Sequence, residues 1–228
     1  MLDLLDKYNI ELDSREIELF KKFLDLFIEK NSQINLSAIR KVEDIIEKHF
    51  IDSIMLNVFL DLKGNVGDVG TGGGFPLIPL AITNKNVNFT GIDSVGKKLK
   101  AIDEFVLKLG LKNIVTLNGR CEELGKDLKY RETFDYVLSR ATAFMPTLIE
   151  YTIPFLKVGG IFVAYKLDDK EELNSSKKAL NRLGAKILKV KNYKIGEQKR
   201  TLVFIEKVSK THKKYPRNIG EPLKNPIK

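Results

Sequence analysis

The run Asp68-Val69-Gly70-Thr71-Gly72-Gly73-Gly74-Phe75-Pro76 has the composition of a loop that binds a small molecule. Glycines at this density allow the main chain to turn sharply and a ligand to approach it closely. A phosphate-binding Walker loop is excluded, because no lysine follows the glycines. A dinucleotide site expects Gly-x-Gly-x-x-Gly, and Phe75 occupies its third glycine position here. Pro76 also removes an N–H donor that a pyrophosphate would use at the start of the following helix.

Polar residues follow the next apolar segments as well. Asp93 lies 23 residues after Gly70, and an acid at about this spacing commonly accepts hydrogen bonds from ribose hydroxyls. Capping of the helix that follows is the alternative role for Asp93. The run Asn118-Gly119-Arg120-Cys121-Glu122-Glu123 comes after the third apolar segment, and Ser139-Arg140-Ala141 comes after the fourth. We therefore expect these groups to line one site.

An alternation of short apolar segments with amphipathic helices must position these groups. Helices are expected from 76 onward and over 96–109, 145–155 and 171–183. Seven strands are expected at 66–69, 87–92, 114–117, 134–138, 160–165, 186–190 and 201–205. This order predicts an α/β fold with a doubly wound, mostly parallel seven-stranded sheet. The last two strands, with no helix between them, predict an antiparallel strand at one edge.

Residues 1–63 are expected to form an N-terminal helical cap. Asp13-Ser14-Arg15-Glu16 has the spacing of a capping box, and apolar residues then recur at helical spacing. Asn31-Ser32-Gln33 predicts the end of this helix, and a further helix is expected over about 42–60.

An acid followed by Gly-x-Gly-x-Gly resembles motif I of the class I methyltransferases. The resemblance implies a Rossmann-like fold that binds S-adenosylmethionine (SAM), a cationic ligand that needs no anion-holding helix start. The glycine loop then wraps the methionine part, the acid after the second strand takes the ribose, and residues after the third strand flank the adenine. The cofactor-binding residues implied are Asp68, Gly70, Gly72, Gly74, Phe75, Asp93, Cys121, Glu122 and Arg140.

Further motifs resemble a single family in order along the chain, from about residue 20 to the end. They are Asn35-Leu36-Ser37-Ala38-Ile39, Lys48-His49-Phe50-Ile51-Asp52-Ser53, the glycine loop, Asp93-Ser94-Val95-Gly96-Lys97-Lys98, Ser139-Arg140-Ala141, Arg200-Thr201-Leu202 and Lys214-Tyr215-Pro216-Arg217. The chain is similar to the RsmG family, also called GidB. The resemblance implies N7 methylation of one guanosine in 16S ribosomal RNA (rRNA) of the small subunit. Cys121 stands where the family usually has a small residue such as Ala or Val, which leaves the implied activity intact.

Guanine N7 carries a lone pair and no proton, so its methylation needs alignment of the reactants but no general base. Alignment contributes at best about 7–11 kcal/mol. The chain lacks the Asn/Asp-Pro-Pro-Tyr/Phe motif in which amino-methylating enzymes resemble one another, and it lacks a Pro-Cys pair. Cys121 is therefore not expected to be a nucleophile. Arg140 is the candidate catalytic residue, acting by positioning, with a salt bridge at the pocket rim as the alternative. We expect Arg140→Ala to lower methylation strongly without unfolding the protein.

The net charge of +9 is concentrated toward the C-terminus. Residues 207–228, up to the final Lys228, hold seven basic side chains and one acidic one. Dense like charge favours an anionic partner, and RNA of the small ribosomal subunit is the expected one, with a solvated tail as the alternative. The expected domains are the cap at 1–63, a SAM-binding core at 64–207 and a basic tail at 208–228 on or near the core. The RNA-binding candidates are Arg200, Lys213, Lys214, Tyr215 and Arg217.

One cysteine and two histidines predict no metal site. No apolar run reaches the roughly 18 residues of a membrane span, so a cytoplasmic protein without membrane contact is expected, with a monomer as the default. Two other functions remain open at this point. One is a non-catalytic RNA- or ribosome-binding module, which SAM binding would test; the other is a small-molecule methyltransferase, which the salt dependence of activity would test. A nicotinamide oxidoreductase is disfavoured by the glycine spacing.

Overall fold

The computed structural model describes residues 1–140, 142–167 and 170–227, and of Lys170 the backbone alone. Ala141 and Lys228, which belong to the fourth-strand motif and the basic tail, lie outside the described residues. No helix in the described part of the chain is long and apolar enough to cross a membrane.

Seven strands within the described residues form one sheet in the order β3-β2-β1-β4-β5-β7-β6. They are β1 (Asn65–Val69), β2 (Asn88–Asp93), β3 (Ile114–Asn118), β4 (Phe134–Arg140), β5 (Leu156–Lys166), β6 (Ala185–Ile195) and β7 (Gln198–Lys207). The first five strands pair in parallel, and β7 runs antiparallel to both β5 and β6. This arrangement confirms the predicted sheet. The strand order reverses between β1 and β4, the point at which open α/β sheets bind ligands.

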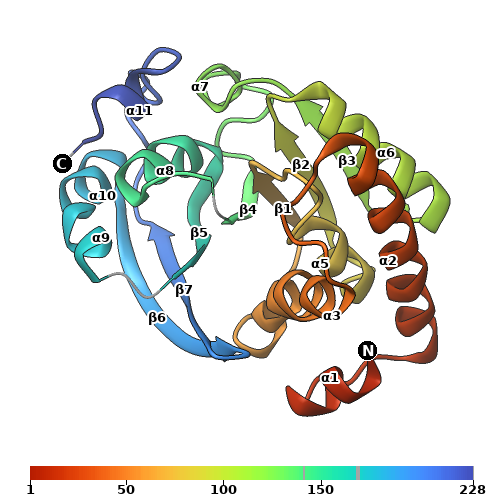
Figure 1. The fold of residues 1–228 in the computed structure, drawn as a ribbon. Helices are drawn as coiled ribbons and strands as arrows, with labels where there is room; N and C mark the ends of the chain where they lie inside the picture. Colours follow the sequence, from red (N-terminus) through yellow and green to blue (C-terminus); the bar gives the residue numbers. More distant parts are fainter. Residues whose placement is uncertain (141, 168–169, 228) are drawn as a thin grey trace.

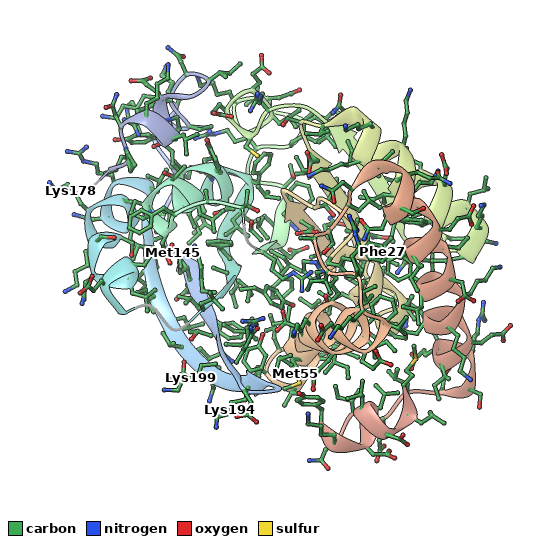
Figure 2. All side chains as sticks on the ribbon, viewed as in Figure 1. Phe27, Met55, Met145, Lys178, Lys194 and Lys199 are labelled. Atoms are coloured by element: carbon green, nitrogen blue, oxygen red, sulfur yellow. The ribbon has the colours of Figure 1, made fainter. Side chains whose placement is uncertain are left out.

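Helices cover both faces of the sheet (Figure 1). One apolar cluster joins the N-terminal helices to the helices that follow β1 and β2, and a second joins helices that follow β4 and β5 to the opposite face. Phe27 belongs to the first cluster and Met145 to the second, and Figure 2 labels both. The helices after β1 are α5 (Leu77–Thr83), α6 (Gly96–Leu109), α7 (Cys121–Leu124), α8 (Met145–Thr152), α9 (Lys170–Ser175), α10 (Lys177–Leu183) and α11 (Glu221–Lys224). The single helix predicted over 171–183 is thus divided at Ser176, whose buried hydroxyl bonds the carbonyl of Leu173.

The N-terminal region is helical, as predicted, but it is more irregular than its periodicity indicates. Its elements are α1 (Leu2–Lys7), α2 (Ser14–Ile34), α3 (Val42–Ile45), a π-helical turn (Ile46–Ile51), α4 (Asp52–Ile54) and a 3₁₀ turn (Met55–Val58). Both bonds of the predicted capping box are present between Asp13 and Glu16 at the start of α2. The prediction that α2 ends at 31–33 was wrong. Asn31 is a buried helical residue, and its side chain accepts a hydrogen bond from the backbone of Ser37 and so shapes the next loop.

A cluster of phenylalanine rings joins these helices to the glycine loop. The ring of Phe23 in α2 stacks on Phe50 at a centroid distance of 5.2 Å and contacts Phe75 at 5.5 Å. Phe27, one turn further along α2, meets Phe75 edge-on at 5.0 Å. Aromatic pairs of this kind contribute about 0.5–1.5 kcal/mol beyond the area they bury. The N-terminal helices therefore form one core with the sheet and fix the position of Phe75.

The chain after β7 packs back on the protein as a strap, defined here as residues 211–225. Arg131 donates hydrogen bonds to the carbonyls of Thr211 and Tyr215, at 2.7 and 2.8 Å. Tyr215 is 4% exposed and joins the second apolar cluster. The strap ends in α11, which lies above α8 in Figure 1.

Candidate functional site

A cavity of about 490 Å³ lies where the loops after β1, β2, β3 and β4 meet. We call it the loop cavity. The predicted cofactor residues in its wall are Gly70, Gly72, Phe75, Asp93, Cys121, Glu122 and Arg140. Asp68 and Gly74 are buried and do not line it. The structure thus brings most of the predicted site together at the carboxyl ends of the strands, as parallel sheets do.

The glycines of the loop are required by its backbone. Gly70, Gly72 and Gly74 have φ angles of +74°, +56° and +88°, which side chains of L residues rarely allow. A Cβ atom on Gly70 would also lie 2.5 Å from Oγ1 of Thr142. The main chain of the loop is therefore exposed to the cavity without side chains in the way.

Asp93 combines both roles considered for it from sequence. Its Oδ2 accepts a hydrogen bond from the backbone N–H of Gly72 at 3.0 Å, and its Oδ1 accepts one from Val95 at 2.8 Å. The second bond orders the turn before α6, while the carboxylate remains in the cavity wall. A carboxylate accepts about four hydrogen bonds, so Asp93 retains capacity for hydroxyl donors.

Asp68 is completely buried beneath the loop, and neither of its carboxylate oxygens makes a hydrogen bond of normal geometry among the described residues. The hydroxyl of Thr71, which lines the cavity, is also buried without a partner within this part of the chain. Burial raises the pKa of Asp68 to about 7, although the Thr71 side chain and the Leu77 backbone lie close enough to act in the lowering direction. A buried polar group without a partner is costly, so the Thr71 hydroxyl in the wall, with Asp68 buried behind it, marks the end of the cavity that suits a hydrogen-bonding ligand.

The opposite end of the cavity is formed by residues after β3. Glu122 is 4% exposed, and its Oε1 accepts a hydrogen bond from the backbone N–H of Gly220 at 3.0 Å. Burial raises the pKa of the Cys121 thiol to about 12, with a further contribution from the charge of Glu122. Burial likewise raises the pKa of Tyr151 to about 12. Cys121 and Tyr151 therefore stay protonated at neutral pH, which agrees with the prediction that Cys121 is not a nucleophile.

Arg140 at the end of β4 is held by groups from the N-terminal region. Its Nη1 donates to the carbonyl of Lys48 and to Oδ2 of Asp52, each at 3.1 Å. Its Nη2 bonds Nδ1 of His49 at 2.9 Å, and the guanidinium lies 5.5 Å from the centre of the Phe75 ring. Its side chain is only 13% exposed. Arg140 is therefore more than an ion pair at the pocket rim.

The carboxylate of Asp52 is the acidic group that Arg140 shares with two further side chains. Asp52 is 3% exposed and accepts hydrogen bonds from Arg140 and from the hydroxyl of Tyr193 at 2.7 Å, and Nε of Arg200 lies 3.7 Å from its Oδ1. Its partners come from β4, β6 and β7.

The ring of His49 stacks on Phe75 at a centroid distance of 4.5 Å and an interplanar angle of 13°. Burial, and then the charge of Arg140, lower its pKa to about 3. His49 is thus neutral at physiological pH. It lines the loop cavity together with Ser37, whose Oγ lies 2.7 Å from His49 Nε2.

A second cavity, of about 470 Å³, opens on the other side of Arg140 and His49, which line both cavities. We call it the Arg200 cavity. The remaining residues in its wall include Lys48, Asp52, Tyr165, Lys166 and Arg200. Lys166 is paired with Glu172 and donates a hydrogen bond to the carbonyl of Ala143. The molecule thus has two adjoining spaces, separated by the Arg140–His49 pair.

Comparison with known proteins identifies the family. The family model for GidB, described as rRNA small subunit methyltransferase G, matches residues 16–203. The protein named ribosomal RNA small subunit methyltransferase G from Lactococcus lactis subsp. lactis is 40% identical over 232 residues, covering 100% of this chain and 98% of its own length. The protein of the same name from Acetivibrio thermocellus is 42% identical, over 96% of this chain and 92% of its own. This chain belongs to the GidB family. It is therefore a SAM-dependent rRNA methyltransferase, and the family prediction is confirmed.

Solved structures agree on the fold. M. jannaschii TYW2 in complex with AdoMet matches with a TM-score of 0.56 and 17% identity, over 75% of this chain and 80% of its own. A SAM-dependent methyltransferase from Aquifex aeolicus matches with a TM-score of 0.53 and 21% identity, over 72% of this chain and 93% of its own. The class I Rossmann-like fold of this GidB-family chain is therefore confirmed.

The RNA-binding candidates from the sequence are scattered over the structure. Lys213 and Lys214 are exposed on the strap. Tyr215 is buried, so the stacking surface expected of it is not available in this structure. Arg217 is bound to the fully buried carboxylate of Glu150 through Nε and Nη2. Arg200 lies apart from these residues, in the second cavity.

Sequence reasoning missed Ser37, His49 and Tyr151 as residues of the loop cavity. The signal for the first two was present, because Asn35–Ile39 and Lys48–Ser53 were quoted as family motifs without an assigned chemical role. The structure gives both motifs a role, because residues of the second motif bind Arg140 and Ser37 of the first binds His49. Tyr151 lies in α8 and had no motif to mark it.

Proposed function

We propose that this protein transfers a methyl group from SAM to N7 of a guanosine in 16S rRNA, with SAM in the loop cavity and the target base in the Arg200 cavity. The observation that carries this proposal is that the two cavities meet at Arg140 and His49. Methyl transfer by displacement needs the methyl donor and the accepting atom on opposite sides of the transferred methyl group. Two adjoining cavities can hold the two reactants in this arrangement.

The residues of the loop cavity fit SAM. Bound SAM supplies a methyl group activated by a positively charged sulfur. The buried carboxyl group of Asp68 and the hydroxyl of Thr71 place hydrogen-bonding capacity beneath the glycine loop, where the methionine part is expected. Asp93 would hold the ribose hydroxyls. Cys121 and the Glu122 carboxylate would flank the adenine, and Gly70, Gly72 and Phe75 would form the wall between these ends.

The protein's own residues act by orientation. Because neutral guanine N7 has no proton, none has to be removed before attack. His49 agrees with this, since burial and the charge of Arg140 lower its pKa to about 3, and both ring nitrogens already have partners in Arg140 and Ser37. Alignment of the two reactants would then provide the acceleration, up to roughly 7–11 kcal/mol.

Arg140 is the residue best placed to orient the base. Within the described residues, its Nη1 makes two hydrogen bonds and its Nη2 makes one. A guanidinium has five N–H donors, so donors remain for an oxygen of the substrate or cofactor. We assign Arg140 a contact with guanine O6 or with a carboxylate or phosphate oxygen at the junction of the cavities.

RNA would approach from the side of the Arg200 cavity and across the strap. Arg200, Lys213 and Lys214 remain the candidate phosphate contacts, whereas Tyr215 and Arg217 are assigned to holding the strap. Lys194 and Lys199 pair near the end of the β6–β7 hairpin, where Figure 2 labels them, and both are exposed on the sheet face opposite to that of Arg200. We propose that the protein acts as a monomer.

The proposal is tested by transfer of labelled methyl from SAM to small ribosomal subunits that lack the modification, followed by digestion to nucleosides. Label in N7-methylguanosine is the expected result. Label in another nucleoside would overturn the proposed position of attack. If SAM binds but no label is transferred, a non-catalytic RNA-binding module or a small-molecule methyltransferase explains the protein better.

A further inference from the structure

Leu223 enters the loop cavity from the C-terminal end of the chain. It lies in α11 and shares the cavity wall with Cys121, Glu122 and Tyr151. Its side chain is large and apolar, yet the residue is 63% exposed. The fold therefore leaves much of its surface uncovered.

Leu223 is held in this place by the strap. Arg217 binds Glu150 of α8 through its backbone N–H and its side chain, at distances between 2.7 and 3.1 Å, and Glu150 is fully buried. Thr147 of α8 donates a hydrogen bond to the carbonyl of Pro222 at 2.9 Å, directly before Leu223. The bonds between Arg217 and the Glu150 carboxylate are charge-assisted, and such bonds are short and strong.

The strap also holds a polar neighbour of Leu223. The backbone N–H of Gly220 donates to Oε1 of Glu122, so the strap and the residue after β3 are joined across the cavity rim. One oxygen of Glu122 is thereby oriented, and the hydroxyl of Tyr151, which also lines the cavity, interacts with the same carboxylate. An apolar side chain beside a carboxylate acceptor matches a flat heteroaromatic ring with an exocyclic amine at its edge.

We propose that Leu223 contacts the adenine ring of the cofactor and that the strap is a structural part of the cofactor site. The proposal rests on the assignment of SAM to the loop cavity. The basic tail then has two parts with different roles. Its buried side, with Arg217 and Tyr215, shapes the cofactor pocket, and its exposed lysines face outward.

The test is the dissociation constant (Kd) of SAM and of S-adenosylhomocysteine, measured by calorimetry on the full chain. Leu223→Ala should raise both constants by the same factor, roughly three- to tenfold, because it removes apolar contact of a few carbon atoms. Leu223→Met should restore binding. The matched control is Ile219→Ala, since Ile219 is a 54% exposed residue of the same strap that does not line the cavity.

An unchanged Kd in Leu223→Ala overturns the proposal. So does a raised Michaelis constant (KM) for ribosomal subunits together with unchanged SAM binding, which would place Leu223 against RNA. Because both variants change exposed side chains, circular dichroism should show the wild-type fold. If the wild-type protein itself binds no SAM, the proposed function fails first, so the two failures are distinguishable.

Discussion

Arg140 donates a hydrogen bond to Nδ1 of His49 over 2.9 Å, and this bond determines the state of the imidazole ring. Since guanidinium nitrogens are donors only, Nδ1 must be the acceptor, and the proton of the neutral ring lies on Nε2. That proton is donated to Ser37 Oγ, which also accepts the backbone N–H of Ile39 at 3.1 Å. A protonated ring would place a second positive charge next to Arg140, and the two charges would repel each other. His49 is thus a positioning residue for Arg140.

Replacement of Arg140 by lysine should lower kcat/KM roughly 10- to 100-fold. A lysine keeps the charge but cannot bond Asp52, Lys48 and His49 together, and hydrogen bonds to charged groups contribute about 1.5–3 kcal/mol each. Steady-state kinetics on small subunits would measure this. A lysine variant with wild-type kinetics would remove Arg140 from the mechanism.

Arg140→Ala should lower stability as well as activity, which modifies the expectation from sequence. Asp52 is 3% exposed and would lose one cationic partner, although Tyr193 and Arg200 remain beside it. Removing one member of a buried ion pair is commonly destabilising. Urea unfolding of the alanine and lysine variants would separate the two effects, because the lysine variant retains a charge near Asp52.

The protein should lose stability in mild acid through His49. The pKa of His49 is about 3 in the folded protein and 6.5 in an unfolded chain. The unfolded state therefore binds a proton that the folded state excludes between these values. The stabilisation is complete above pH 6.5 and is lost as the pH falls toward 3, by at most about 1.4 kcal/mol per pH unit.

Denaturant unfolding of His49→Gln between pH 7 and pH 4.5 would measure this effect. The variant should lose less stability than the wild type over that range, since glutamine does not titrate. The exposed His212, changed to glutamine, controls for the loss of a histidine. Parallel pH curves for the wild type and His49→Gln would contradict the assignment.

Cys121→Ala should keep methylation within roughly tenfold of the wild type. The pKa of the thiol is raised to about 12, so it has no role as a nucleophile, and the family usually has a small residue there. Volume-conserving changes of this kind usually cost less than about 1.5 kcal/mol. Kinetics with saturating SAM would test this, and abolished turnover with intact SAM binding would point to covalent chemistry.

Changing Lys213 and Lys214 together to glutamine should weaken binding of ribosomal RNA and reduce its salt dependence. Each lost phosphate contact lowers the slope of log K against log salt by roughly 0.7–0.9. Lys177 and Lys178, exposed on α10, provide a control pair with the same charge change, and Figure 2 shows Lys178 at the periphery. Equal salt slopes for both double variants would leave the strap without a specific RNA contact.

The sheet and the glycine loop could be predicted because local patterns determine them. Apolar segments bounded by turn residues mark the strands, and the φ angles of Gly70, Gly72 and Gly74 explain why those positions carry glycine. The helix predicted over 42–60 was wrong as a single element. It contains a π-helical turn and a 3₁₀ turn, and helical periodicity alone does not reveal such changes of pitch.

The partners of Arg140 could not be predicted from local patterns, because they lie some 90 residues away in the chain. Charge density also gave an incomplete account of the C-terminal segment. It treated Arg217 as a free cation, whereas a buried acid on α8 neutralises it. Only tertiary packing decides which basic residues are free to face an anionic partner and which pair with acids inside the fold.

The loop cavity draws its walls from both ends of the molecule, with Leu36 and Ser37 on one side and Leu223 on the other. A chain emerging from the ribosome folds from its N-terminus onward. The phenylalanine cluster and the parallel strands are therefore synthesised well before the segment that completes the pocket. Cofactor affinity thus becomes a late event in biogenesis, and a chain interrupted shortly before Leu223 would hold a nearly finished sheet around an open, incomplete pocket.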